Sequence, residues 1–448
     1  MKKVAVFGLA LTGTAVARAL VARGITVVLS DDRINDDHRS LARELSSPIR
    51  EVDTAEAINS FLEGVDTLLP APGVPPHHPV IRAAEDLSIE IRTEIDVAYE
   101  WEQARVGGPR PILGVTGTDG KTTTTMIVAH LLRSTGLAVG EVGNTDLPFM
   151  GEIDAPHDIF VVECSSFRLQ YTTVFRCESS VWLNIAPDHL DWHPNITHYT
   201  NAKARLWAHA RSTDIAVMPA GNETITPYAL QSGARAITFG ISDADYCVRD
   251  GWLVSPHGAL IEVSKLWRSM PHDITNSLAA AAMVLEAGLV DVASVGESLA
   301  TFTSAHHRIE FIAERNGTSW YNDSKATSPH AALTAIRAFD RLVLIAGGRN
   351  KGLDLGQMAT EPHRMAGVVA IGDDAALIAQ AFNGVCPVVT ASSMSEAVDA
   401  ANNLASPGTH VVLSPGCTSY DWYRNYNERG EDFTRLVHEL LTDKESAS

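Results

Sequence analysis

The sequence predicts an α/β protein of three successive domains, each built around its own mostly parallel sheet. Short apolar runs of strand length alternate along the chain with amphipathic stretches of helix length, a pattern typical of strand–helix–strand units. Two of the predicted strands lead into glycine-punctuated turns that open a helix. A chain of 448 residues is also too long for one hydrophobic core. We place the domains at 1–95, 96–303 and 304–448.

The composition indicates which kinds of partner the chain does not bind and in which compartment it works. A formal net charge of −19 without a basic tract argues against nucleic acid, because binding needs cations that displace counterions from phosphates. No apolar run approaches the ~18 residues of a membrane span. The cysteines are scattered and lack C-x-x-C spacing, which indicates reduced thiols rather than a disulfide framework or a zinc site. We therefore expect a cytoplasmic chain without a signal peptide. We also predict a monomer that acts on small molecules.

The first domain opens with an alternation of strand and helix. Residues 3–8 are typical of a short buried strand, 12–24 of an amphipathic helix, and 26–32 of a second strand. The proline-rich loop 70–79 follows the next predicted strand, 66–69, and we expect its histidines to be exposed loop residues rather than metal ligands. This order predicts a Rossmann-like domain.

The turn after the first strand runs from Gly8 to Gly13 and approaches the dinucleotide-binding pattern G-x-G-x-x-G. Asp31 follows near the position of a ribose-binding acid. Ala10 stands where a second glycine normally lets the backbone approach a pyrophosphate, which weakens the prediction of NAD. The turn therefore predicts a nucleotide or diphosphate ligand, with a tight turn that binds no ligand as the alternative.

The second domain begins after the linker 107–111 with a phosphate-loop pattern of unusual build. The predicted strand 112–115 and helix 121–136 enclose the loop "TGTDG", so backbone N–H groups and the helix dipole point to one spot. The common pattern G-x-x-x-x-G-K-[ST] does not fit, because Val115 takes the place of its leading glycine. The arrangement still predicts phosphate binding in a P-loop ATPase-like central domain.

Side chains of this loop supply the remaining chemistry. Lys121 adds a positive charge and Thr122 a hydroxyl that can reach Mg²⁺, so both residues and the loop glycines are predicted phosphate contacts. We assign the next threonines, Thr124 and Thr125, to helix capping and the helix surface.

Polar side chains follow two buried strands of the second domain. Strand 158–163 ends at Glu163, and strand 180–185 leads to His189. Ligands of open α/β sheets collect at the carboxyl ends of strands, so both residues are predicted to meet a metal ion held by the loop. Solvated or structural roles are the alternative. Lys203, in a helix-like stretch, would on its own be a surface lysine.

The third domain begins near Ser304 and contains five strand candidates with helical stretches between several of them. The candidates are 319–324, 341–348, 367–372, 387–390 and 409–416. Spacing alone assigns no role to the polar residues of the joining stretch, Arg308, Asp323, Ser324 and Lys325.

The loop "GVTGTDGKTTTT" resembles the ATP loop of the Mur ligases and folylpolyglutamate synthases, usually T-G-T-N-G-K-[ST]-[ST], which lacks the leading glycine. Further segments occur in the order of the Mur ligase family along essentially the whole chain: "GNTDLP", "VVECSSFRLQ", "LNIAPDHLDWH", "AKARL", "HHRIE", "NDSKAT", "GGRNK" and "SPGCTSYDWYRNYNERGEDF". "NDSKAT" is similar to the D-glutamate-adding branch, since the branch that adds diaminopimelate or lysine would show Asp-Asn-Pro-Arg.

The resemblance implies a fold and an activity. The N-terminal domain would bind the UDP substrate, the central domain ATP, and the C-terminal Rossmann-like domain the amino acid. The reaction would add D-glutamate to UDP-N-acetylmuramoyl-L-alanine through an acyl phosphate, with ATP and two Mg²⁺ ions, in peptidoglycan precursor synthesis. A ligase that adds L-glutamate or another acidic amino acid is the alternative.

The resemblance also assigns residues. ATP would be bound by Gly117, Thr118, Asp119, Gly120, Lys121, Thr122, Thr123, Asn276, Arg308 and Asp323. Mg²⁺ would be held by Thr122, Glu163, His189 and Lys203, the last as the family's carbamylated lysine. The UDP substrate would contact Leu11, Thr12, Asp32, Arg33, Pro72, Gly73 and Asn144. Glutamate would contact Lys325, Thr327, Lys351, Ser419 and Tyr426. Catalysis would depend on Lys121, His189 and Lys203.

The chain departs from the family pattern at four positions. Asp119 and Asp273 each stand where asparagine is usual, and both bear on the geometry of nucleotide binding. Ser328 stands where asparagine is common and Tyr426 where phenylalanine is, and these two bear on amino-acid selectivity.

Two functions of other classes are alternatives. An NAD-dependent oxidoreductase would use the first domain, but Ala10 and the second phosphate loop weigh against it. A P-loop motor or regulatory switch would hydrolyse ATP alone, so its turnover would not need an amino acid.

Overall fold

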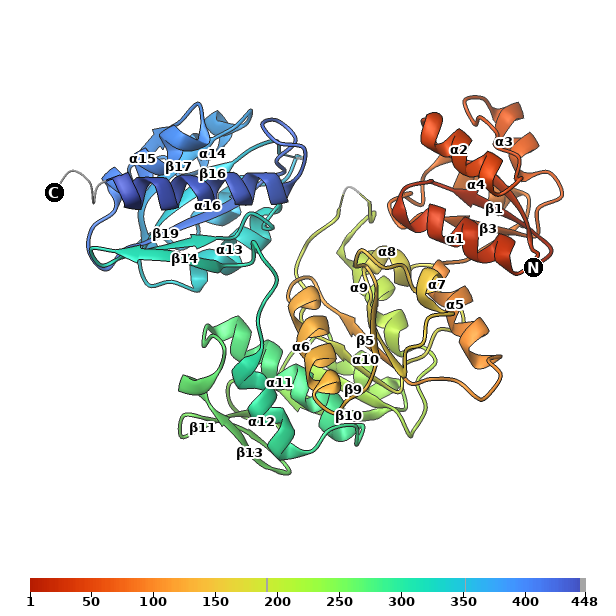
Figure 1. The fold of residues 1–448 in the computed structure, drawn as a ribbon, viewed down its shortest axis with the longest axis horizontal. Helices are drawn as coiled ribbons and strands as arrows, with labels where there is room; N and C mark the ends of the chain where they lie inside the picture. Colours follow the sequence, from red (N-terminus) through yellow and green to blue (C-terminus); the bar gives the residue numbers. More distant parts are fainter. Residues whose placement is uncertain (191, 351, 444–448) are drawn as a thin grey trace. The chain divides into compact units, whose positions relative to one another are not determined.

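The computed structural model describes residues 1–190, 192–350 and 352–443. Its sheets are mostly parallel and alternate with helices, which confirms the predicted α/β class (Figure 1). The chain divides into two compact units, Met1–Phe302 and Thr303–Ser448. The division into three domains at 1–95, 96–303 and 304–448 stays a prediction.

The first sheet of the first unit is parallel, with strand order β2-β1-β3-β4. Its strands are β1 (Lys3–Phe7), β2 (Thr26–Ser30), β3 (Thr67–Pro70) and β4 (Glu90–Ile91). The helices are α1 (Leu11–Ala22), α2 (Asp36–Glu44), α3 (Ala55–Leu62), α4 (Pro79–Asp86) and α5 (Glu94–Gln103). Val4 and Val6 of β1 belong to one core and Ala5 and Phe7 to another, because successive strand residues face opposite sides of the sheet.

The central sheet has six parallel strands in the order β10-β9-β8-β5-β7-β6. These are β5 (Ile112–Thr116), β6 (Val139–Gly143), β7 (Ile159–Glu163), β8 (Ser179–Trp182), β9 (Ile215–Pro219) and β10 (Arg235–Phe239). A small antiparallel sheet follows, with β11 (Cys247–Arg249), β12 (Trp252–Ser255) and β13 (Gly258–Glu262). Because β7 and β8 flank β5 on opposite sides, the strand order reverses at β5, and open α/β sheets bind ligands at the carboxyl ends of such strands.

Helices cover both faces of the central sheet. They are α6 (Lys121–Arg133), α7 (Phe149–Glu152), α8 (Ser166–Leu169), α9 (Ile196–Ala204), α10 (Thr226–Gln231), α11 (Pro271–Glu286) and α12 (Val292–Thr301), with short 3₁₀ turns at Arg205–Trp207 and Val263–Lys265. α6 and α11 lie side by side and share one core with the sheet (Figure 1). The opposite face shares a core with the first sheet, which fixes the first sheet to the central one.

The second unit holds a six-stranded sheet in the order β14-β15-β19-β16-β17-β18, parallel except for β14. The strands are β14 (Glu310–Arg315), β15 (Thr318–Asn322), β16 (Leu342–Gly347), β17 (Met365–Ile371), β18 (Val388–Thr390) and β19 (His410–Gly416). The helices are α13 (Pro329–Arg337), α14 (Ala375–Ala381), α15 (Met394–Leu404) and α16 (Tyr426–Asp443), with 3₁₀ turns at Leu355–Ala359 and Pro362–Arg364. All five predicted strands are confirmed. The sixth strand of this sheet, β14 at its edge, was not predicted.

Candidate functional site

The loop between β5 and α6 is held in place by Asn184, the second residue after β8. The Asn184 side-chain oxygen accepts hydrogen bonds from the backbone N–H groups of Thr118 and Asp119, each at 2.9 Å. Gly120 precedes α6 with φ +79°, and a Cβ there would lie 2.7 Å from the Asn276 side-chain oxygen on α11. Glycine is therefore required both by the left-handed backbone and by the close approach of α11.

Two lysines converge on one carbonyl of this loop. Lys121 donates to the carbonyl oxygens of Gly117 at 2.9 Å and Thr118 at 2.8 Å. Lys203, on α9, donates to the same Gly117 oxygen at 2.6 Å and is only 1% exposed. Burial and the charge of Lys121 lower the pKa of Lys203 well below its usual value. The helix-like stretch alone suggested a surface lysine, and this is wrong, because Lys203 is buried.

Tyr199 is a member of this site that the sequence did not single out. Its ring centroid lies 4.6 Å from the Lys203 nitrogen and 6.2 Å from the ring centroid of His189. Its hydroxyl lies 3.2 Å from the Thr118 hydroxyl. It lies one helical turn before Lys203 on α9, and this i, i+4 spacing is the signal that could have found it.

Glu163 ends β7 beside β5 and is 2% exposed. Its Oε1 accepts from the Asn144 side chain at 2.9 Å, whereas Oε2 has no hydrogen-bond partner among the described residues. His189 has a positive φ of 54°, and its Nε2 lies 3.3 Å from an Asp188 oxygen. Glu163 therefore ends one of the two strands that flank β5, and His189 follows the other; their contact with a metal ion stays a prediction.

Six of the seven predicted UDP residues follow β1, β2 and β3, and the seventh, Asn144, follows β6. Asp31 accepts from the backbone N–H of Leu9 at 2.7 Å and of Arg33 at 3.1 Å, so its carboxylate fixes the turn. Asp32 lies 3.0 Å from Nε2 of His78, whose ring packs against Phe7. The expectation that both loop histidines are exposed is wrong for His78, because Phe7 and Asp32 hold its ring.

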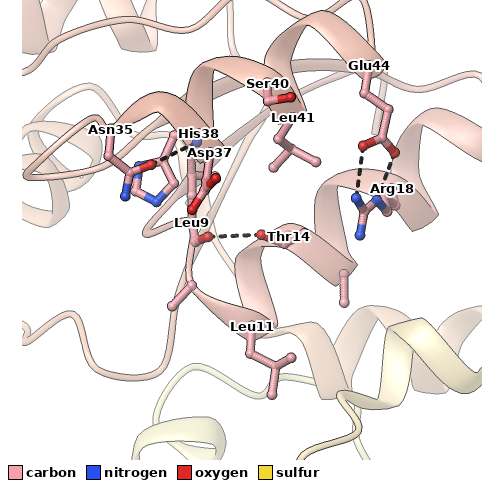
Figure 2. A pocket seen from close by; sticks show the side chains of 12 residues that line it. Leu9, Leu11, Thr14, Arg18, Asn35, Asp37, His38, Ser40, Leu41 and Glu44 are labelled. Carbon is pink, nitrogen blue, oxygen red and sulfur yellow. Dashed lines mark hydrogen bonds and ion pairs between the residues drawn. The ribbon is translucent and has the colours of Figure 1, made fainter. Parts of the chain in front are cut away.

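A cavity of about 570 Å³ lies between α1 and α2. Figure 2 shows Leu11 at its edge and the pair Arg18–Glu44 at its far end. Leu11 is the one member of the predicted UDP set among its lining residues. The cavity therefore overlaps with the predicted UDP contacts at Leu11 alone.

Four of the five predicted amino-acid residues lie in the second unit after β15 and β19, which are neighbours in the sheet. The Lys325 nitrogen donates to the Tyr426 hydroxyl at 2.5 Å and lies 4.0 Å from the centre of its ring. Ser419 is buried in the loop after β19, and Thr327 precedes α13. Lys351 lies outside the described residues.

Arg429, on α16, joins these two loops and was missed by the sequence reasoning. Its guanidinium is buried and donates to the Ser324 hydroxyl, the Ser324 carbonyl and the Cys417 carbonyl at 3.0, 2.9 and 3.2 Å. Burial lowers its pKa to about 10. No spacing in the sequence links a helix near the C-terminus to these loops.

Asp323 fixes the segment that carries Arg308. Its carboxylate accepts from the Ile309 backbone N–H at 3.2 Å and from the Ser414 hydroxyl at 2.6 Å. His307 and Ile309, on either side of Arg308, both have positive φ. Arg308 and Asp323 belong to the second unit, whereas Asn276 belongs to the first.

Three family models match the chain in order. The Mur ligase MurD-like N-terminal domain matches residues 2–93, the Mur ligase middle domain 115–284, and the Mur ligase glutamate ligase domain 307–417. The UDP-N-acetylmuramoylalanine–D-glutamate ligase of Caldanaerobacter subterraneus is 33% identical, with 98% of each chain covered. The enzyme of that name from Frankia casuarinae is 36% identical over 97% of this chain and 93% of its own. The chain belongs to the Mur ligase family.

Solved structures of other Mur ligases share the fold. The UDP-N-acetylmuramate-alanine ligase of Thermotoga maritima matches with a TM-score of 0.61 at 18% identity, over 98% of this chain and 99% of its own. The MurF ligase of the same organism, in complex with ADP, matches with a TM-score of 0.60 at 16% identity, over 94% and 91%. The predicted fold class and family are confirmed. Within the described residues, none of the helices combines the length and apolar character that crossing a membrane requires.

The residues present fit a Mg²⁺ site in this Mur ligase only in part. The described ranges contain no cluster of three or more His, Cys, Asp and Glu that could hold a metal ion. Glu163 offers a buried oxygen that has no hydrogen-bond partner in the part of the chain that the structure describes, and a hard cation prefers such an oxygen ligand. Lys203 as an ammonium repels a cation, so it fits the set only after conversion to an anionic group.

Two departures from the family pattern have structural roles here. Asp273 is buried at the start of α11 and forms an ion pair with Arg268, at 2.5 and 2.9 Å. Ser328 caps α13 by accepting from the Ala331 backbone N–H at 3.3 Å. The Asp273 carboxylate thus neutralises the Arg268 guanidinium beside α11. A neutral asparagine at this position would not.

The assignment of Thr124 and Thr125 to the helix surface is wrong. Both side chains are buried, and their hydroxyls have no hydrogen-bond partner among the described residues. The reason is that α6 is enclosed by the central sheet and α11, so its first turns have little free surface.

Proposed function

We propose that the chain is an ATP-dependent ligase that joins D-glutamate to UDP-N-acetylmuramoyl-L-alanine and releases ADP and phosphate. The observation that carries the proposal is the convergence of Lys121 and Lys203 on the Gly117 carbonyl, in a loop that opens a helix. The names of the full-length relatives supply the two substrates. Such a reaction belongs to peptidoglycan precursor synthesis in the cytoplasm, and we propose a monomer.

The chemistry follows from what carboxylates and amines can do. A carboxylate is a poor acyl donor, so one of its oxygens first attacks the γ-phosphorus of ATP, giving an acyl phosphate and ADP. The amine of glutamate then attacks the acyl carbon, loses a proton, and displaces phosphate. The α6 N-terminus and Lys121 would stabilise the charge on the transferring phosphoryl group.

Thr122, Glu163, His189 and a carbamylated Lys203 would hold Mg²⁺, which supplies further neutralisation of phosphate charge when bound. The depressed pKa of Lys203 supports carbamylation, because only the neutral amine reacts with CO₂. Burial beside Lys121 is the physical cause of that depression.

The remaining assignments place substrates on the predicted domains. Residues 1–95 would bind the UDP group through Leu11, Thr12, Asp32, Arg33, Pro72 and Gly73, with Asn144 contributed by the central domain, 96–303. Residues 304–448 would bind glutamate through Lys325, Thr327, Lys351, Ser419 and Tyr426. Thr118, Asp119, Thr123, Asn276, Arg308 and Asp323 would complete the ATP site with the loop glycines.

One assay separates this proposal from its competitors. Phosphate release is measured with ATP, Mg²⁺ and UDP-N-acetylmuramoyl-L-alanine, in the presence of D-glutamate, L-glutamate, D-aspartate or meso-diaminopimelate. Release that requires D-glutamate supports the proposal. Equal release with L-glutamate favours the alternative ligase, and release without any amino acid indicates a simple ATPase.

A further inference from the structure

A buried arginine connects α8 of the central domain to the first turn of α1. Arg168 is 4% exposed. Its guanidinium forms an ion pair with Glu94 at the start of α5, and its Nη2 donates to the Thr12 hydroxyl oxygen at 3.0 Å. Thr12 belongs to the predicted UDP contacts, so Arg168 forms a hydrogen bond with one member of that set.

The ion pair holds the arginine in one orientation. Glu94 is itself buried and its second oxygen accepts from the Met150 backbone N–H at 3.0 Å. Because Glu94 balances the guanidinium, the pair brings a fixed hydrogen-bond donor to α1 but little net charge.

Thr12 has hydrogen-bonding capacity left for a ligand. A hydroxyl has one proton to donate and two lone pairs, and Arg168 occupies one lone pair. Within the described part of the chain the Thr12 hydroxyl makes no second hydrogen bond. The turn before α1 also leaves the first backbone N–H groups of this helix without a side-chain cap.

Arg168 has no room to touch a phosphate directly. The cavity beside it, lined also by Pro72 and Trp192, measures about 10 Å³. That volume admits about one water molecule. The arginine therefore acts on any ligand of the turn through Thr12.

We propose that Arg168 is a positioning residue for the UDP-linked substrate. By donating to the Thr12 oxygen it fixes the rotamer of Thr12, and the hydroxyl proton is then directed to an oxygen of the substrate's diphosphate. The inference rests on the proposed function, since it takes the UDP-linked substrate as the ligand of this turn.

The experiment is a double-mutant cycle on Arg168→Gln and Thr12→Val, read by calorimetric binding of UDP-N-acetylmuramoyl-L-alanine and by steady-state kinetics. Each single variant should weaken binding about tenfold, the worth of one charge-assisted hydrogen bond. KM for the UDP substrate should rise by the same factor, with kcat and the KM for ATP and glutamate unchanged. The double variant should bind no more weakly than Thr12→Val alone.

The matched control is Arg176→Gln. Arg176 is also buried and paired with a carboxylate, Asp214, but contacts none of the predicted substrate residues. It should leave the KM for the UDP substrate unchanged. Should Arg168→Gln fail to fold, Arg168→Lys takes its place, because lysine keeps the charge opposite Glu94 but lacks the fork that reaches Thr12.

The outcomes are distinct. If the wild-type protein does not bind the UDP substrate, the proposed function fails. If the wild type binds but the Arg168 variants bind equally well, the positioning role is overturned. It is also overturned if Arg168→Gln weakens binding further in the Thr12→Val background, because Arg168 would then act independently of Thr12.

Discussion

Replacing Lys203 with methionine separates the stability of the phosphate loop from its chemistry. The Gly117 carbonyl that accepts from Lys203 at 2.6 Å also accepts from Lys121 at 2.9 Å, so methionine leaves no unpaired acceptor. The change gives up a charge-assisted hydrogen bond worth about 1.5–3 kcal/mol. It also removes the larger cost of keeping a cation out of water. We expect Lys203→Met to be inactive yet more stable than the wild type by about 1–2 kcal/mol at pH values below the folded-state pKa of Lys203.

The pH dependence of this difference has a definite sign. Burial and the Lys121 charge lower the pKa of Lys203 well below its usual value. Between that pKa and about 10.4, the value in the unfolded chain, the unfolded state binds a proton that the folded state does not. Wild-type stability therefore rises with pH in this window, by up to about 1.4 kcal/mol per unit. The stability gap is full below the folded pKa and closes as pH rises through the window.

Calorimetric unfolding across this window, in buffer free of CO₂ and Mg²⁺, measures the gap. A gain of about 1–2 kcal/mol corresponds to a melting temperature higher by about 2–6 °C. Lys265→Met is the control, because the Lys265 side chain is 62% exposed and should show no comparable shift. A less stable Lys203→Met protein, a gap independent of pH, or ligation at the wild-type rate would refute the reasoning.

Three further predictions test the phosphate loop, the amino-acid site and the carbamate on Lys203. Lys121→Ala should abolish ligation, because the loop loses its fixed cation at the transferring phosphoryl group; wild-type turnover would remove Lys121 from the ATP site. Lys351→Ala should raise KM for glutamate far more than for ATP, since an ammonium there would pair with the glutamate side chain; equal effects on both would place Lys351 elsewhere. Wild-type enzyme depleted of CO₂ should lose activity and regain it with bicarbonate, with mass spectrometry under native conditions reporting the added carboxylate, whereas full activity with a bare amine would exclude the carbamate.

The sequence anticipated features that depend on local pattern. β5, the loop and α6 were predictable because an apolar strand, paired glycines and an amphipathic helix follow each other within a few residues. β14 was not, because this half-exposed edge strand lacks a clear alternation of buried and exposed residues.

Contacts between distant segments explain the other differences. Thr124 and Thr125 are buried by α11, some 150 residues further along the chain. Arg168 and Arg429 were overlooked because their partners, Thr12 and Ser324, lie far away in sequence. Burial of a polar residue by a remote helix leaves no trace in local periodicity.

The hydrogen-bond partners of the cations distinguish two uses of positive charge. Among the described residues, Lys121 and Lys325 are held by carbonyl or hydroxyl oxygens and form no ion pair with a carboxylate. Neutral acceptors fix a cation without cancelling its charge, so its field remains available to an anion. In a chain with net charge −19, whose proposed substrates are all anionic, this is the arrangement that attracts them locally.

Three buried arginines of the first unit, unlike Arg429 of the second, are held by carboxylates. Arg110 pairs with Glu102 and Arg176 with Asp214, and neither contacts a predicted substrate residue. Arg168 shares this pairing through Glu94 although it touches Thr12. Its charge is therefore already balanced, and its contribution to substrate binding must come through the geometry of Thr12 rather than through attraction. Raising the ionic strength should accordingly weaken substrate binding by the wild type and by Arg168→Lys by the same factor, because lysine keeps the charge opposite Glu94, and salt screens free charges rather than a buried, balanced pair.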